Sequence, residues 1–184
     1  MLKRKWTELS KKRKTTFFVF LVLSVAWMCV IYGFSADDAK ASSKHSGKMT
    51  EKIVNIVDDE YKHPEVPKPD TFEYFAERTV RKTAHFMCYA VLATLCYFTF
   101  GALLGVPSKK MNVSAAGAFA VSVLYASFDE FHQTFVDGRF GSPIDVLIDA
   151  GGSLFGILAC FFGCILYRKY ARRNQKELCS ETNN

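Results

Sequence analysis

The feature that most constrains the fold is the absence of charge from four long apolar windows. No Asp, Glu, Lys or Arg occurs at positions 15–36, 83–108, 111–128 or 150–167. Each window is close to the roughly 20 residues that a helix needs to cross the hydrocarbon core of a bilayer. A helix on the surface of a water-soluble domain would instead carry charge on its outer face. The windows therefore predict four membrane spans rather than four helices buried in a soluble core.

The spans are expected to be helical, because lipid offers the backbone no hydrogen-bond partners and only helices or closed barrels satisfy it internally. Barrel strands would show short segments of alternating polarity. The first window contains TFFVFLVLSVAWMCVIYGF, which does not alternate. The sequence thus predicts an all-α integral membrane bundle of four transmembrane helices, forming a single domain over residues 1–184.

The distribution of charge predicts the orientation of the bundle. Basic residues gather in the segments 1–14, 106–112 and 168–184, where acids are scarce. By the positive-inside bias, both termini and the middle loop face the cytoplasm, so that residues 35–82 and 129–149 face outward. This pattern explains the net charge of +6 without a nucleic-acid partner.

The predicted boundaries follow from the same windows. In chain order they are a basic cytoplasmic tail at 1–14, a first span at 15–34, an extracellular segment at 35–82, spans at 83–106, 112–132 and 143–167, and a cytoplasmic tail at 168–184. A cleavable signal peptide is the alternative for the first span, since basic residues precede it and Gly33 and Ser35 are small. The apolar run is longer than a usual signal core, which favours a retained anchor.

The extracellular segment contains two expected helices. In KMTEKIVNIVDDEY, at 48–61, apolar residues recur at helical spacing, which predicts a short amphipathic helix on the membrane or across the mouth of the bundle. Prolines follow and end it. Asp70 and Glu73 then have the spacing of a capping box, and the helix that they start is expected to continue into the second span.

Ionisable residues gather at the outward ends of the later spans. In ASFDEFHQTFVDGR, at 126–139, Asp129 lies three residues before His132 and four before Gln133, so the three are expected to share a helix face. Asp145 and Asp149 are four apart near the start of the last span. Acids and histidines in spans are costly and usually face a bundle interior or a wet cavity, so we expect these residues to meet at one outward-facing site.

Other polar residues are expected to join them. His85 lies about one turn into the second span, next to Arg81 and Lys82, which interfacial snorkelling would also explain. Arg139, in the loop before the last span, could bridge two carboxylates or hold an anionic ligand.

Three uses of this polar group stay open. It could fix the register of the helices, bind a polar head group in a shallow outward pocket, or catalyse a reaction. For catalysis, a histidine beside carboxylates could act as a general base, and His85, His132 and a carboxylate would suit zinc. Neither signal is specific, because DEFHQ is not the H-E-x-x-H motif and no C-x-x-C pair occurs. Cofactor and metal are therefore not assigned.

Small residues predict close helix packing. The last span contains DAGGSLFG, in which Gly152 and Gly156 form a G-x-x-x-G arrangement. The third span contains AAGAFA from Ala115, which would also let backbones approach.

Two stretches carry a resemblance to a known family. RKTAHFMCYAVLATL, at 81–95, and DEFHQTFVDGRFGSPIDVLIDAGGSLFG, at 129–156, resemble the VanZ-like family of small bacterial membrane proteins. FSADDAKASSKHS, after the first span, is similar to the serine-bearing stretch of that family, and the resemblance runs from about Trp27 to Gly156. Two positions depart from the family pattern, Cys88 where Glu is frequent and Asp149 where Asn is frequent.

The resemblance implies a set of site residues and a setting. The implied ligand-binding residues are Arg81, Lys82, His85, Tyr89, Asp129, Glu130, His132, Gln133, Arg139 and Asp145. The resemblance implies no particular reaction, and the catalytic candidates, drawn from the residues themselves, are His85, Asp129, Glu130 and His132. The family name implies an association with resistance to teicoplanin-type glycopeptides in the bacterial plasma membrane. The expected partners are membrane lipids and a cell-wall precursor or lipoglycopeptide. The alternatives are a membrane-embedded enzyme acting on an envelope lipid and a structural accessory protein.

Overall fold

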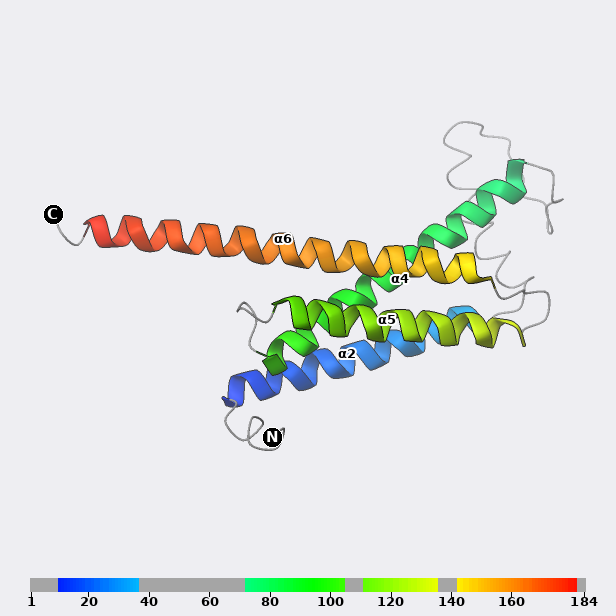
Figure 1. Cartoon of the computed structure of the whole chain (residues 1–184), viewed down its shortest axis with the longest axis horizontal. Coiled ribbons are helices and arrows are strands. Elements are labelled where there is room, and N and C mark those ends of the chain that lie inside the picture. The colour runs from blue at the N-terminus through cyan, green and yellow to red at the C-terminus, as the bar shows by residue number, and fades with distance from the viewer. Residues whose placement is uncertain (1–9, 37–71, 105–110, 136–141, 182–184) are drawn as a thin grey trace.

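The computed structural model describes residues 10–36, 72–104, 111–135 and 142–181, which form four helices in up-and-down order (Figure 1). They are α2 (Lys11–Ala36), α4 (Phe72–Leu104), α5 (Met111–Gln133) and α6 (Pro143–Glu181). All four are long and apolar enough to cross a membrane, and no strand occurs in these ranges. The predicted all-α bundle with four candidate spans is thereby confirmed. The amphipathic helix expected at 48–61 lies outside the described residues, and the orientation stays a prediction.

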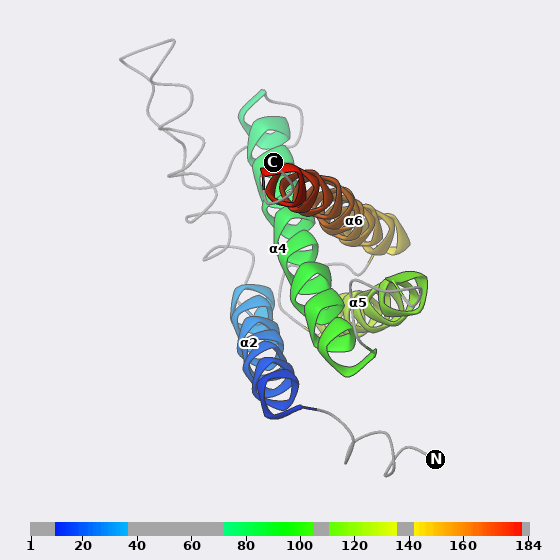
Figure 2. The same ribbon diagram turned by 90° about the vertical axis from the view of Figure 1, so that its left-hand side faces the viewer.

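α4 is the central helix of the bundle and packs against α2, α5 and α6 (Figure 2). Its buried apolar side chains recur at helical spacing along one broad face, namely Tyr89, Leu92, Ala93, Cys96 and Tyr97. Ile31 of α2, Ala118 and Ala126 of α5, and Ile157 of α6 complete this core. As predicted for the helix that contains Glu73, α4 continues into the second span without a break.

Large apolar side chains cover the outside of the bundle. Phe18, Leu124, Leu147 and Leu166 are 53%, 70%, 71% and 65% exposed. Contiguous apolar surface of this extent is unusual on a water-soluble monomer and suits contact with lipid. Because lipid is as apolar as leucine, the helices must be held together by close packing and hydrogen bonds.

The closest packing joins α6 to α4 through two glycines. A Cβ atom on Gly152 would lie 2.1 Å from the carbonyl oxygen of Phe86, and one on Gly156 would lie 2.2 Å from that of Ala90. Both obstacles are backbone atoms, which cannot rotate away. The packing role predicted for this G-x-x-x-G pair is confirmed.

Hydrogen bonds from side chains to backbone also tie the helices together. The Trp27 indole of α2 donates to the carbonyl of Cys88 at 2.9 Å, and the Tyr125 hydroxyl of α5 donates to that of Met28 at 2.6 Å. At one end of the bundle, the Arg13 guanidinium donates to the carbonyls of Ala102 and Leu103 in the last turn of α4, at 3.0 and 3.2 Å. This contact fastens the start of α2 to the end of α4.

α6 extends well past the predicted end of the fourth span. The segment from Arg168, predicted as a tail, continues the helix to Glu181. No Gly or Pro occurs after Gly163, and Arg, Lys, Gln and Glu are good helix formers. The helix therefore projects beyond the bundle (Figure 1).

Candidate functional site

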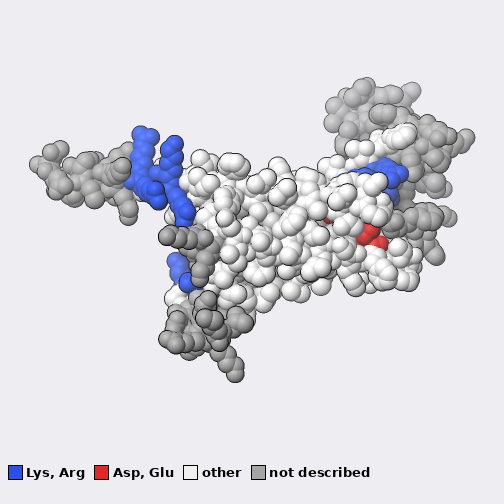
Figure 3. Space-filling model, viewed as in Figure 1, with Lys and Arg blue, Asp and Glu red and all other residues white. Residues whose placement is uncertain are grey.

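The two ends of the bundle differ in charge. At one end α2 and α5 finish and α6 begins; we call this the acidic end, because Asp129, Glu130, Asp145 and Asp149 lie there. At the other end α2 begins and α6 continues past Tyr167; we call this the basic end. Among the described residues on the face shown in Figure 3, acidic side chains occur near the acidic end, beside a few basic ones, and uncharged surface separates them from the basic end.

A buried hydrogen-bonded group joins α2 to α5 at the acidic end. The Ser35 hydroxyl donates to Asp129 Oδ2 at 2.8 Å, and the Gln133 amide donates to Ser35 Oγ at 3.1 Å. The same amide nitrogen lies 3.4 Å from Asp129 Oδ2. Asp129 is only 2% exposed and Ser35 is fully buried. The predicted sharing of a face by Asp129 and Gln133 is confirmed, and that face meets α2.

His132 also faces α2, through Tyr32. The Tyr32 hydroxyl lies 3.3 Å from His132 Nε2, and the ring centroids are 4.8 Å apart. Tyr32 lies one turn before Ser35, and Asp129 lies one turn before His132. Two contacts one turn apart, Tyr32–His132 and Ser35–Asp129, therefore connect α2 to α5. His132 Nδ1 is buried without a hydrogen-bond partner in the described part of the chain.

Glu130 fixes the start of α6. Its Oε1 accepts a hydrogen bond from the backbone N–H of Ser142 at 2.6 Å. The Ser142 carbonyl in turn accepts the Asp145 N–H at 2.9 Å, and Pro143 occupies the first helical position, where its fixed φ suits a helix start. Asp145 in the first turn suits the positive end of the helix dipole. The end of α5 thereby anchors the start of α6.

Two pairs of ionisable side chains join α4 to α6. Lys82 forms an ion pair with Asp145, and both side chains are partly exposed. One turn further into the bundle, His85 Nδ1 lies 4.0 Å from Asp149 Oδ2, and the Asp149 side chain is buried. That distance is too long for a hydrogen bond but short enough for a charge interaction if the imidazole is protonated. The predicted common face of Asp145 and Asp149 is confirmed.

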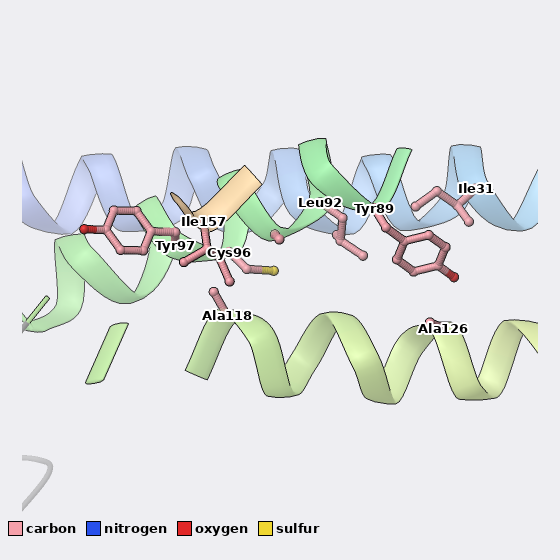
Figure 4. Close-up of a cluster of buried hydrophobic side chains, with 9 residues drawn as sticks. Ile31, Tyr89, Leu92, Cys96, Tyr97, Ala118, Ala126 and Ile157 are labelled. Atoms are coloured by element: carbon pink, nitrogen blue, oxygen red, sulfur yellow. The ribbon is translucent and has the colours of Figure 1, made fainter. Parts of the chain in front are cut away.

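Tyr89 lies between these groups. Its hydroxyl is within electrostatic range of both Asp129 and Asp149. Asp149 is within range of Asp129, Glu130, Asp145 and Lys82, so the four carboxylates form one electrostatic group. Figure 4 shows the Tyr89 hydroxyl pointing toward the acidic end, and that of Tyr97 pointing the opposite way. Within the described residues, the Tyr89 hydroxyl and Asp129 Oδ1 are buried and make no hydrogen bond of good geometry, although the two side chains lie close enough to interact.

The structure thus gathers most of the predicted site residues at the acidic end. Arg81 is partly buried beside Lys82, and Arg139 lies outside the described residues. The zinc set suggested by His85, His132 and a carboxylate is not assembled: the described residues hold no group of three His, Cys, Asp or Glu side chains that could ligate a metal ion. His85 faces Asp149, whereas His132 faces Tyr32.

Sequence reasoning did not place two residues, Ser35 and Tyr32, in the site to which the structure brings them. Ser35 and Tyr32 lie at the end of an apolar window without polar periodicity. The sequence therefore did not indicate which face of that helix packs against the other helices. The spacing of three between Tyr32 and Ser35, matched to that of Asp129 and His132, was the available signal. Asp149 was noticed but left out of the predicted set, because it departs from the family pattern.

The arrangement has two kinds of chemical capacity. The buried side, with Asp129 and Tyr89, offers an acceptor and a hydroxyl whose hydrogen-bonding capacity is not met by the described residues. The more exposed side, with Lys82 and Asp145, offers a cation and an anion at the edge of the bundle. A ligand with several hydroxyl or amino groups could satisfy both sides, as could ordered water on the buried one.

Comparison with known proteins places the chain in a family. The model of the VanZ/LLP1 family matches residues 20–166, which include every residue of the acidic end named above. No curated protein and no solved structure matches the chain. The resemblance seen in the 81–95 and 129–156 stretches is thereby confirmed, and the chain belongs to the VanZ/LLP1 family.

Proposed function

We propose that this chain is a multi-pass protein of the bacterial plasma membrane whose acidic end faces outward and binds the polar head group of a cell-envelope lipid, a peptidoglycan precursor or a lipoglycopeptide. The orientation rests on the basic residues at the opposite end, among them Lys11, Arg13, Arg168 and Arg172, which the positive-inside bias assigns to the cytoplasm. The family's association with teicoplanin resistance supports the same compartment.

The observation that carries the proposal is the incomplete hydrogen bonding of the buried site. Asp129 Oδ1 and the Tyr89 hydroxyl are buried, and neither makes a hydrogen bond of good geometry among the described residues. The two side chains lie close enough to bond each other, but such a bond would still leave the Tyr89 oxygen without a donor. A buried polar group without a partner costs about 1–3 kcal/mol. A bundle that needed these side chains only for packing would gain stability from apolar residues there. Hydroxyl or amino groups of a ligand would supply the missing bonds.

The surroundings favour a head group that carries a lipid tail. Met87 of α4 and Ile144 and Leu147 of α6 are 51%, 63% and 71% exposed on the same helices that carry Lys82 and Asp145. A lipid tail could lie along these apolar side chains while its head group reaches the charged pair. Teicoplanin-type molecules and lipid-linked cell-wall precursors both combine a tail with a polar head.

The test is binding by the purified full chain with Asp129→Asn, which keeps the shape but removes the charge. We expect a labelled teicoplanin-type lipoglycopeptide or lipid-linked peptidoglycan precursor to bind roughly tenfold or more weakly, the loss of one charge-assisted hydrogen bond. The control is Ser127→Ala, whose exposed hydroxyl bonds only the Val123 carbonyl of its own helix. Full binding by Asp129→Asn, or a loss that merely follows the amount of folded protein, would favour a structural role.

The contact of His85 with Asp149 supports a second candidate, an enzyme that modifies an envelope lipid. A carboxylate beside an imidazole can orient it and stabilise its protonated form, as general acid–base catalysis requires. Incubation of purified protein with labelled envelope lipids distinguishes the two functions. A binder returns the lipids unchanged, whereas an enzyme yields a new product that His85→Gln abolishes.

A further inference from the structure

A second feature lies at the basic end, away from the proposed site. A hollow of about 530 Å³ is lined by Ile165, Arg168, Lys169, Arg172 and Arg173 of α6. The spacing of these residues places them on one side of the helix over two turns. The sequence has no Asp or Glu between Asp149 and Glu177, so basic residues predominate on this stretch of α6. The hollow is therefore strongly cationic.

Neighbouring helices add further positive charge to this end. Lys11, Lys12 and Arg13 open α2, whose start lies beside the end of α4. Arg13 is engaged with the α4 carbonyls, whereas Lys11 and Lys12 are exposed. Figure 3 shows the Lys and Arg side chains of this end gathered at one edge of the molecule. An anion is the complementary ligand.

The apolar surface next to the hollow indicates what kind of anion. Phe162, Ile165 and Leu166 are 64%, 45% and 65% exposed on the turns that precede the arginines. Tyr167 and Tyr170 are exposed at the same level, which is typical of side chains at a membrane interface. The hollow thus spans the border between apolar and cationic surface. A phospholipid has the matching order, with acyl chains followed by a phosphate.

A buried hydroxyl accompanies the arginines. Tyr97 of α4 points toward the basic end (Figure 4), and Arg168 lies within electrostatic range of it. The Tyr97 hydroxyl is buried and makes no hydrogen bond of good geometry in the described part of the chain, where the Cys164 thiol, a weak partner, lies close enough to interact with it. It resembles the Tyr89 hydroxyl at the opposite end in this respect. A polar group that enters between α4 and α6 could accept its hydrogen.

We infer that the hollow formed by Ile165, Arg168, Lys169, Arg172 and Arg173 binds the phosphate of an anionic phospholipid, whose acyl chains lie along Phe162 and Leu166. Basic pockets at the ends of transmembrane helices are suited to such head groups. This site is independent of the proposed outward-facing one, because it uses other residues at the other end of the bundle. The bound lipid would anchor α6 to the membrane at the point where the helix leaves the bundle.

The experiment measures binding of phosphatidylglycerol to the purified full chain in detergent by native mass spectrometry. The test variant combines Lys169→Gln with Arg172→Gln, two exposed residues of the hollow. The control combines Lys11→Gln with Lys12→Gln, which removes the same charge from the same end. We expect phosphatidylglycerol to bind about tenfold more weakly to the test variant, because each basic residue near a lipid head group adds to the binding free energy. Binding to the control should change little. Phosphatidylcholine should bind weakly to all three proteins.

Three results would overturn the inference. The first is equal loss in test variant and control, which would mean attraction by total charge. The second is no loss in the test variant. The third is full displacement of phosphatidylglycerol by inorganic phosphate at about the lipid's own concentration, which would identify a site for free phosphate in which the acyl chains contribute nothing. Because both substituted side chains are exposed, we expect the test variant to fold, and an unchanged circular dichroism melting curve checks this.

Discussion

The acidic and basic ends of the bundle use charge in opposite ways. At the acidic end, α2, α4, α5 and α6 all supply side chains, and Ser35, Asp129 and Asp149 are buried. At the basic end, the cations of the hollow come from α6 alone and are mostly exposed. The polar groups at the acidic end bond one another across helices and therefore help to determine how the helices pack. The exposed charges of the hollow are expected to affect mainly how the bundle interacts with its surroundings. Substitutions at the two ends should therefore differ in what they damage.

The largest effect is expected where α4 and α6 touch, because this contact aligns Lys82 and His85 with their partners. Gly152→Ala would place a methyl group against the Phe86 carbonyl and force the helices apart. Overpacking of this kind costs about 1–3 kcal/mol, and the rigid obstacle favours the upper part of that range. Unfolding of the purified protein in a denaturing detergent measures it.

The matched control for this prediction is Gly163→Ala, in the same helix but with no atom within 4 Å of the added carbon. It should be neutral or slightly stabilising, since alanine favours helix more than glycine does. Equal destabilisation by both substitutions would mean that α4 and α6 are not in close contact.

A smaller loss is expected from Ser35→Ala, which removes the donor to the buried Asp129 carboxylate. The carboxylate would keep the longer contact with Gln133, so we expect a stability loss near the lower end of about 1–3 kcal/mol, together with weaker ligand binding. Ser24→Ala on the same helix is the control, because Ser24 donates to the Phe20 carbonyl of its own helix at 2.7 Å and its longer contact with α4, 3.4 Å to the Thr99 hydroxyl, involves no carboxylate. If the two serines behaved alike, the Ser35–Asp129 contact would not contribute to stability.

The smallest effect on stability is expected from Lys82→Gln, because the ion pair with Asp145 is partly exposed. Exposed pairs contribute about 0–1 kcal/mol, so the melting temperature should barely change. Ligand binding should fall nonetheless if Lys82 meets the head group. Lys169→Gln at the basic end should leave that binding intact. If both variants lost ligand binding at the acidic end, the two ends of the bundle would not differ in function as proposed.

The sequence allowed the fold to be predicted better than the site. Charge-free windows located the four candidate spans, since a helix in lipid must exclude charge, and Gly152 and Gly156 predicted a close helix contact, which the structure places between α6 and α4. Spacing within one helix correctly grouped Asp129 with Gln133 and Asp145 with Asp149. Pairing between helices could not be read, because a uniformly apolar helix such as α2 has no polar side to show which way Ser35 and Tyr32 face. The separate surroundings of His85 and His132 likewise depend on tertiary packing, whereas the helical extension past Arg168 follows from the absence of Gly and Pro after Gly163.

The claim on which the proposed function most depends is that the acidic end faces outward, and thiol labelling in intact cells tests it directly. In a variant whose native cysteines are replaced by alanine, Phe135→Cys would mark the acidic end and Tyr170→Cys the basic end; both positions are well exposed, at 72% and 64%. We predict that a membrane-impermeant maleimide labels position 135 in intact cells and position 170 only after permeabilisation. The reverse pattern would contradict the proposal.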